Sequence, residues 1–184
     1  MSVIRIYKDS NLSHTTDLLF TSENNTKIRD CLEKIGVRFE QWHTPVSLSP
    51  GAEQDAVINA YKEDIDRLIA EEGYQTVDVV SLNSDNPQKA ELREKFLNEH
   101  THSEDEVRFF VAGHGLFSMH VDGKVYEVLC QKGDLISVPA NTRHWFDMGP
   151  NPNFIAIRMF NNPDGWVANF TGDHISTHFN RLDN

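Results

Sequence analysis

Residues 99–110, EHTHSEDEVRFF, bring together histidines, carboxylates, an arginine and aromatic rings within twelve positions. If this stretch is mostly extended, successive side chains point to opposite faces. One face then carries His100, His102, Glu106, Arg108 and Phe110, and the other carries Val107, Phe109 and Val111. The two imidazoles and the Glu106 carboxylate therefore converge on one side of the chain.

Burying such a polar set costs roughly several kcal/mol for each unpaired charge unless something compensates it. A divalent cation would do so, because two neutral imidazoles and a carboxylate suit iron, nickel, manganese, cobalt or zinc. A second stretch, GDLISVPANTRHWF, has a strand, turn, strand pattern that can bring His144 across to the first set. We therefore predict a metal site with four side-chain ligands.

The elements that position these residues are strands. From about residue 100 to residue 160, short segments rich in β-branched and aromatic residues are separated by Gly, Pro, Asn or Asp: EVRFFVAG, GLFSMHVDG, KVYEVLC, DLISVP, HWFDMG and NFIAIRMF. This spacing is typical of a β-sandwich or small barrel. The VDGK stretch is the strongest hairpin signal.

The first half of the chain has helical periodicity instead. In NNTKIRDCLEKIG, apolar residues recur at helical spacing and Gly36 is a plausible end. A second helix is predicted after SLSPG, with Ser49 as its cap, Pro50 at its first position, a stripe from Val57 to Ile69 that includes Tyr61, and Gly73 at its end. A third begins at Asn86 and Pro87. Between them, VRFEQW and TVDVVSLN are predicted strands.

Composition narrows the class of protein. A chain of 184 residues is long enough for one domain with a real core. Its net charge of -11 would repel a nucleic-acid backbone or an anionic membrane, so a small-molecule ligand is expected. Cys31 and Cys130 have no CxxC spacing, and the opening residues show no apolar stretch of signal-peptide length. We expect a cytoplasmic protein, and a monomer because no exposed apolar stripe requires a partner.

Two motifs resemble those of the cupin superfamily. His100, His102, Glu106 and Gly113 match the spacing of the first motif, and Gly133, Pro139, Asn141 and His144 match that of the second. Asn141 replaces the usual glycine, a substitution that left-handed turn geometry tolerates. The stretches EHTHSEDEVRFFVAGHGLF, PANTRHWFDMG and IRMF further resemble the acireductone dioxygenase family of methionine salvage.

The resemblance implies a mainly β protein with flanking helices, built as a cupin-type double-stranded β-helix, or jelly-roll barrel. A single cupin domain would span residues 1–184, with a helix-rich part at about 1–98 and the metal-binding core at about 99–170. It implies one Fe(II) or Ni(II) per chain, held by His100, His102, Glu106 and His144. It implies catalytic and substrate contacts by Arg108 and Arg158, and further substrate contacts by Phe96, Phe146 and Trp166.

The implied reaction cleaves acireductone with dioxygen. The iron form would yield formate and 2-keto-4-methylthiobutyrate, and the nickel form would yield formate, carbon monoxide and 3-methylthiopropionate. The sequence leaves the metal open, since imidazoles and a carboxylate accept several ions. It also leaves open a different cupin enzyme, such as an isomerase or decarboxylase, and a non-catalytic metal-binding or small-molecule-binding cupin.

Several residues have a structural alternative. Arg108 can pair with Glu104 or Glu106 instead of with substrate. His114 and His120 are predicted as surface or hairpin residues, because no second acid is evident near them in the sequence. His174 and His178 are assigned to a solvated tail, and Trp42 and Trp145 to packing.

Overall fold

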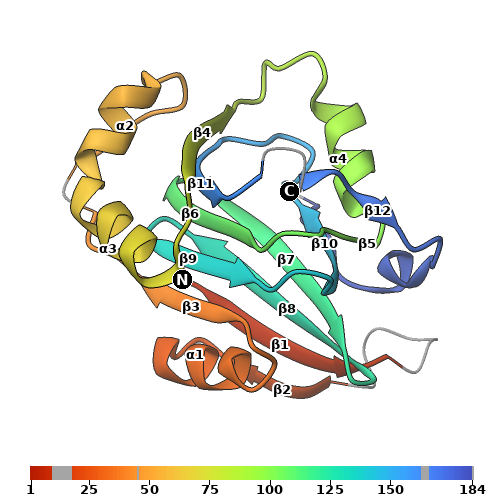
Figure 1. Ribbon diagram of the computed structural model, residues 1–184. Helices are drawn as coiled ribbons and strands as arrows, with labels where there is room; N and C mark the ends of the chain where they lie inside the picture. The colour runs from red at the N-terminus through yellow and green to blue at the C-terminus, as the bar shows by residue number, and fades with distance from the viewer. Residues whose placement is uncertain (10–17, 45, 163–165, 184) are drawn as a thin grey trace.

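Two antiparallel β-sheets pack face to face in this computed structural model, which describes residues 1–9, 18–44, 46–162 and 166–183 (Figure 1). The larger sheet contains, in spatial order, β12 (Asn169–Phe170), β5 (His100–Thr101), β10 (Arg143–Asp147), β7 (His114–Val121), β8 (Lys124–Gln131), β1 (Val3–Lys8) and β2 (Leu18–Ser22). The smaller contains β3 (Arg38–Gln41), β9 (Asp134–Val138), β6 (Glu106–Ala112), β11 (Phe154–Phe160) and β4 (Thr76–Leu82). From β6 to β11 the chain crosses repeatedly from one sheet to the other, which confirms the jelly-roll prediction.

The alternation in β6 assigns its side chains to two separate apolar clusters. Phe110 packs between the sheets with Phe117 and Met119, whereas Phe109 packs on the outer face of the smaller sheet. The face assignment predicted from residues 107–111 is therefore confirmed. The VDGK hairpin is also confirmed, since Val121 pairs with Lys124 at the β7–β8 turn.

The first helix forms as predicted. The Asn24 side chain caps α1 (Asn25–Glu33) by accepting a hydrogen bond from the Lys27 amide, and Gly36, at φ +75°, turns the chain after the helix. Ile28 and Leu32 on α1 are fully buried in the inter-sheet cluster. The predicted stripe thus attaches the helix to the core.

The second predicted helix is wrong in its bounds, because the structure has two shorter helices there. These are α2 (Gln54–Ala60) and α3 (Lys62–Glu72), separated at Tyr61 by a non-helical backbone (φ -119°, ψ 18°). Ser49 accepts a turn hydrogen bond from Ala52, so neither Ser49 nor Pro50 starts the helix. The apolar stripe survives the break, since Val57, Tyr61, Ile65 and Leu68 all cover the smaller sheet.

Two N-terminal strands were missed. β1 and β2 join the larger sheet, so the first half is less helical than predicted. Their signal was the alternation in VIRIYK, where Ile4 and Ile6 point into the core. The third helix, α4 (Lys89–Leu97), begins after a turn at Asn86.

The C-terminal segment covers part of the outer face of the larger sheet. Within it, the 3₁₀ helix η2 (Ile175–His178) buries Ile175 against Trp145, and Phe179 packs on the same cluster. His174 and His178 are exposed, but the segment as a whole is docked rather than solvated. Trp42 and Trp145 are packing residues, as predicted, and His114 is exposed. No helix among the described residues combines the length and apolarity needed to span a bilayer.

Candidate metal centre

The four predicted ligands come from both sheets. His100 lies in β5 directly opposite His144 in β10, and Glu106 begins β6 of the other sheet. The expectation that His100, His102 and Glu106 share one extended strand is wrong, because the chain turns at residues 103–105 and crosses between the sheets. The cluster therefore joins the two sheets at one end of the barrel.

This crossing is fixed by hydrogen bonds from the second motif. The Ala140 amide donates to the Asp105 carboxylate at 2.9 Å, and the Asn141 amide donates to the His102 carbonyl at 2.7 Å. Asn141 has φ +63°, which confirms that it occupies the left-handed position expected for the motif's glycine. These hydrogen bonds thus join the two motifs beside the predicted ligands.

The cluster is compact and buried. One ligand atom from each of His100, His102, Glu106 and His144 lies within 4.8 Å of all the others. The four residues are between 2% and 7% exposed. Glu106 Oε2 lies 2.7 Å from His144 Nε2 and 3.2 Å from His102 Nε2. The same carboxylate uses Oε1 to pair with Arg108 Nη2 at 2.8 Å.

The backbone selects the tautomer of all three imidazoles. Each Nδ1 faces a carbonyl oxygen: that of Asn98 for His100 (2.7 Å), of Val167 for His102 (3.2 Å) and of Thr142 for His144 (2.7 Å). Because a carbonyl only accepts, each Nδ1 must carry the proton, and a neutral ring then turns its bare Nε2 toward the cluster. Lone pairs on Nε2 facing a carboxylate repel unless a cation lies among them. This donor set fits a divalent metal.

The protonation states of His100 and Glu106 favour the binding of a cation. Burial, with a smaller contribution from the neighbouring His144, lowers the pKa of His100 to about 4, so this ring is neutral at pH 7. Burial alone would raise the pKa of Glu106, but the positive charge of the adjacent Arg108 holds it well below its ordinary value. Glu106 is therefore an anionic carboxylate beside the neutral imidazole of His100.

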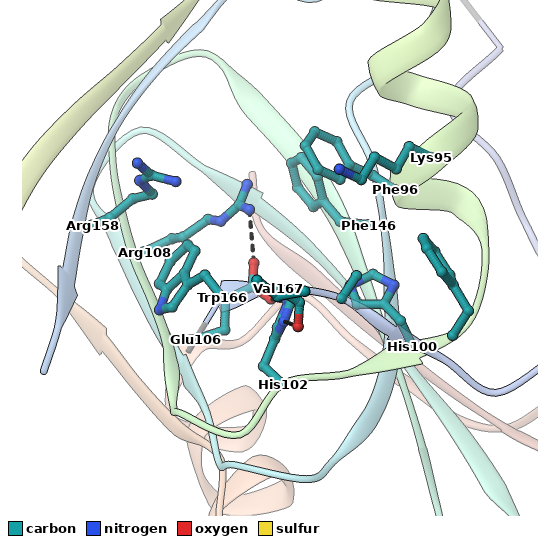
Figure 2. Close-up of a pocket in the computed structure, with 12 residues that line it drawn as sticks. Lys95, Phe96, His100, His102, Glu106, Arg108, Phe146, Arg158, Trp166 and Val167 are labelled. Atoms are coloured by element: carbon teal, nitrogen blue, oxygen red, sulfur yellow. Dashed lines mark hydrogen bonds and ion pairs between the residues drawn. The ribbon is translucent and has the colours of Figure 1, made fainter. Parts of the chain in front are cut away.

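A pocket of about 490 Å³ opens onto this cluster (Figure 2). Every predicted substrate residue lines it: Phe96, Arg108, Phe146, Arg158 and Trp166. The Arg108 guanidinium is centred 4.8 Å from the Phe146 ring centroid, and Arg158 lies 5.0 Å from that of Trp166. The structure thus brings together in one pocket the five side chains that only the family resemblance had grouped.

Both arginines have a carboxylate partner. Arg108 pairs with Glu106 rather than Glu104, so the predicted ion pair exists at the pocket wall. Arg158 makes a two-pronged pair with Asp78, with Nε–Oδ1 at 2.8 Å and Nη2–Oδ2 at 2.5 Å. Asp78 was missed, since it sits on β4, and only the register Arg158↔Asp78 between β11 and β4 reveals it.

The pocket also has lining residues that the sequence did not identify. These are Lys95, Val167, Ala168 and Phe170. Lys95 precedes the predicted Phe96 on α4, and Figure 2 shows it on the opposite side of the pocket from Arg158. Phe170 reaches the pocket because β12 pairs with β5, a contact that sequence spacing does not reveal.

Comparisons with known proteins agree on one family. The profile of the ARD/ARD' family matches residues 3–168. The chain is 69% identical over 151 residues to the acireductone dioxygenase of Alcanivorax borkumensis, covering 82% of this chain and 83% of that protein. It is 59% identical over 183 residues to the acireductone dioxygenase of Pseudomonas fluorescens, covering 100% of this chain and 99% of that protein.

A solved structure agrees at the level of the fold. The acireductone dioxygenase from Bacillus anthracis, with a cadmium ion in its active centre, superposes with a TM-score of 0.78 at 33% identity. The match covers 92% of this chain and 98% of that one. A relative with this fold therefore holds a divalent metal ion in its active centre.

Proposed function

The chain belongs to the ARD/ARD' family, and from this membership we propose that it is a metal-dependent dioxygenase cleaving acireductone, 1,2-dihydroxy-3-keto-5-methylthiopentene. One observation carries the proposal. Three imidazoles turn bare Nε2 atoms toward one buried carboxylate at the base of a pocket lined by two arginines. Such a site suits a small anionic ligand that chelates a metal.

We assign the metal to His100, His102, Glu106 and His144. All four donors are nitrogen or oxygen and none is a thiolate, so Fe(II) and Ni(II) are both suitable occupants, one per chain. When bound, the ion would act as a Lewis acid and a template for the substrate oxygens. The resident metal, the monomeric state and the cytoplasmic location stay predictions from the sequence.

Arg108 and Arg158 would bind and orient the enediolate. Arg108 is buried and already paired with Glu106, so it is fixed in place before substrate arrives. Arg158 is held by Asp78 through Nε and Nη2, which aims its planar group from β11. A guanidinium presents its donors in a rigid fork, which suits two neighbouring oxygens of an anion. In a chain of net charge -11, these two cations and Lys95, which also lines the pocket, supply the local attraction.

Aromatic rings would exclude water and enclose the apolar tail. Phe96 and Phe146 lie in edge contact with their ring centroids 6.5 Å apart, and Trp166 stacks near His102 at 6.1 Å. Sulfur packs well against aromatic rings, so these side chains suit a methylthio group. Excluding water also strengthens the charge interactions of the arginines with substrate.

The test is oxygen uptake by one apoprotein preparation reconstituted separately with iron and nickel. We expect uptake with acireductone in both forms, with carbon monoxide in the headspace only for nickel. The iron form should give formate and 2-keto-4-methylthiobutyrate, and the nickel form 3-methylthiopropionate in its place. Absence of uptake from both verified metal forms would leave an isomerase, a decarboxylase or a non-catalytic cupin as the better assignment.

A further inference from the structure

A second histidine–carboxylate cluster lies on the outer face of the larger sheet. His120 lies in the β7–β8 hairpin, one of its two predicted settings, but it is only 6% exposed and so is not a surface residue. Its Nδ1 lies 2.8 Å from Glu99 Oε2, and its Nε2 lies 3.1 Å from Asp9 Oδ2. The sequence hid this arrangement, since the two acids are 21 and 111 residues away from the histidine.

This cluster is complete without a metal. Carboxylates only accept hydrogen bonds, so both ring nitrogens of His120 donate and the ring is an imidazolium. Consistently, the hydrogen bond to Glu99 raises the pKa of His120, burial opposes this, and Asp9 adds to the increase. The carboxylates and the imidazolium satisfy one another, and none is left to ligate an ion.

Glu99 connects this cluster to the metal centre. It directly precedes His100, and its other oxygen, Oε1, accepts a hydrogen bond from Thr171 Oγ1 at 2.8 Å. The Glu99 carbonyl also accepts from the Thr171 amide at 3.1 Å. One buried side chain therefore ties the start of β5 to His120 on β7 and to the segment that follows β12.

β5 needs such an anchor because it is only two residues long. It is flanked by β10 and β12, as Figure 1 shows, and pairs with β10 through a single residue pair, His100↔His144. Ligand positions must hold to within roughly 0.5 Å for a site to be competent, which so short a ladder does not secure by itself. Fixing Glu99 fixes the backbone that carries His100 and leads to His102.

We propose that Glu99 and His120 are positioning residues that hold β5, and with it His100 and His102, in the geometry required for metal binding. The inference rests on the metal site of the proposed function but concerns neither a ligand nor a substrate contact. Supporting groups around a metal site commonly change its affinity about 10- to 100-fold when they are removed. Because Glu99 acts through the backbone, we expect the lower end of that range.

The experiment measures Co²⁺ binding by Glu99→Gln and His120→Asn. Competition with a chromophoric chelator gives the dissociation constant, and the ligand-field absorption of the bound Co²⁺ reports its coordination. Both variants should bind Co²⁺ about tenfold more weakly than the unmodified protein. Both should also alter the absorption bands, which a purely structural role would leave unchanged.

The matched control is Glu127→Gln. Glu127 is also a fully buried carboxylate of the larger sheet, and it anchors the C-terminal segment by accepting from the Asn180 amide at 2.9 Å and from Asn180 Nδ2 at 2.8 Å. It does not adjoin a ligand in the sequence. We expect this variant to lose stability while keeping the affinity and the spectrum of the unmodified protein.

The outcomes separate this inference from the proposed function. Equal Co²⁺ affinity and spectra in all three variants and the unmodified protein would overturn the positioning role, as would an equal loss in Glu127→Gln. Failure of the unmodified protein to bind Co²⁺ would overturn the metal site itself. If Glu99→Gln does not fold, Thr171→Val removes only the hydroxyl that donates to Glu99 Oε1, and it should weaken binding about threefold.

Discussion

Two buried histidine clusters occupy opposite faces of the same sheet and balance their charge in opposite ways. On the inner side, three imidazoles bonded to carbonyls leave bare Nε2 atoms around Glu106. On the outer side, one imidazole donates both protons to Glu99 and Asp9. The contrast shows that the hydrogen-bond partner of Nδ1 determines what a buried histidine can do. A carbonyl leaves a lone pair for a metal, and a carboxylate pair produces a cation.

The largest expected effect comes from breaking the inner cluster at its anion. Glu106→Gln keeps the shape but removes the negative charge, so we expect metal content after dialysis to fall by a factor of about 100 or more, and activity with it. Elemental analysis of the purified protein measures this. Glu104→Gln, two residues away and outside the cluster, is the control and should keep its metal.

Removing the ion from the inner cluster should lower the melting temperature of the protein. An ion present at about 1,000 times its dissociation constant stabilises the folded state by about 4 kcal/mol. For a chain of this length that corresponds to roughly 8–16 °C in Tm. We expect a chelator to lower the Tm of the unmodified protein by this order and to leave Glu106→Gln unchanged. An unchanged Tm in the unmodified protein would show that the two sheets do not depend on the ion.

Arg108→Lys tests whether catalysis needs the planar guanidinium of Arg108 or only its positive charge. The lysine keeps the charge beside Glu106 but loses the planar donors, so metal content should persist. We expect kcat/KM to fall about 10- to 100-fold, equivalent to about 1.4–2.7 kcal/mol. Steady-state kinetics together with metal analysis measure both quantities. Turnover equal to that of the unmodified protein would demote Arg108 to a structural ion pair.

The smallest effect concerns pH at the outer cluster. The pKa of His120 is raised by Glu99 and Asp9, against burial, so its stabilisation is fully present below the unfolded value near 6.5 and is lost as the pH rises through the folded value. The loss of unfolding free energy in His120→Asn, relative to the unmodified protein, should be roughly 1–3 kcal/mol at pH 6 and smaller at pH 9. Denaturant titrations at both pH values measure it. A loss that grows with pH would exclude the imidazolium.

Local patterns made the inner cluster predictable from the sequence. The spacing of His100, His102 and Glu106 lies within seven residues, and Asn141 is recognisable because few side chains accept positive φ. Strand alternation likewise assigned Phe109 and Phe110 to different faces. Each of these inferences uses neighbours in the chain, where geometry follows directly from covalent structure.

Features that depend on distant contacts were mispredicted or missed. His120 looked isolated because Glu99 and Asp9 reach it only after β1, β5 and β7 assemble. The break at Tyr61 was hidden because the apolar stripe continues through it. The crossing at residues 103–105 was read as strand, since alternation alone does not show which sheet a strand joins.

The burial of the four predicted ligands beside the pocket has a consequence for the exchange of metal ions. The four residues are at most 7% exposed, and three of them, His100, His102 and Glu106, line the pocket proposed to admit substrate. The chain segment that forms one wall also contributes the Val167 carbonyl that holds His102. An ion held by these residues would leave through the pocket, so a substrate bound there would also trap the metal. Exchange between iron and nickel would then be slow compared with turnover, and each molecule would keep the chemistry of the ion it acquired when it was first loaded.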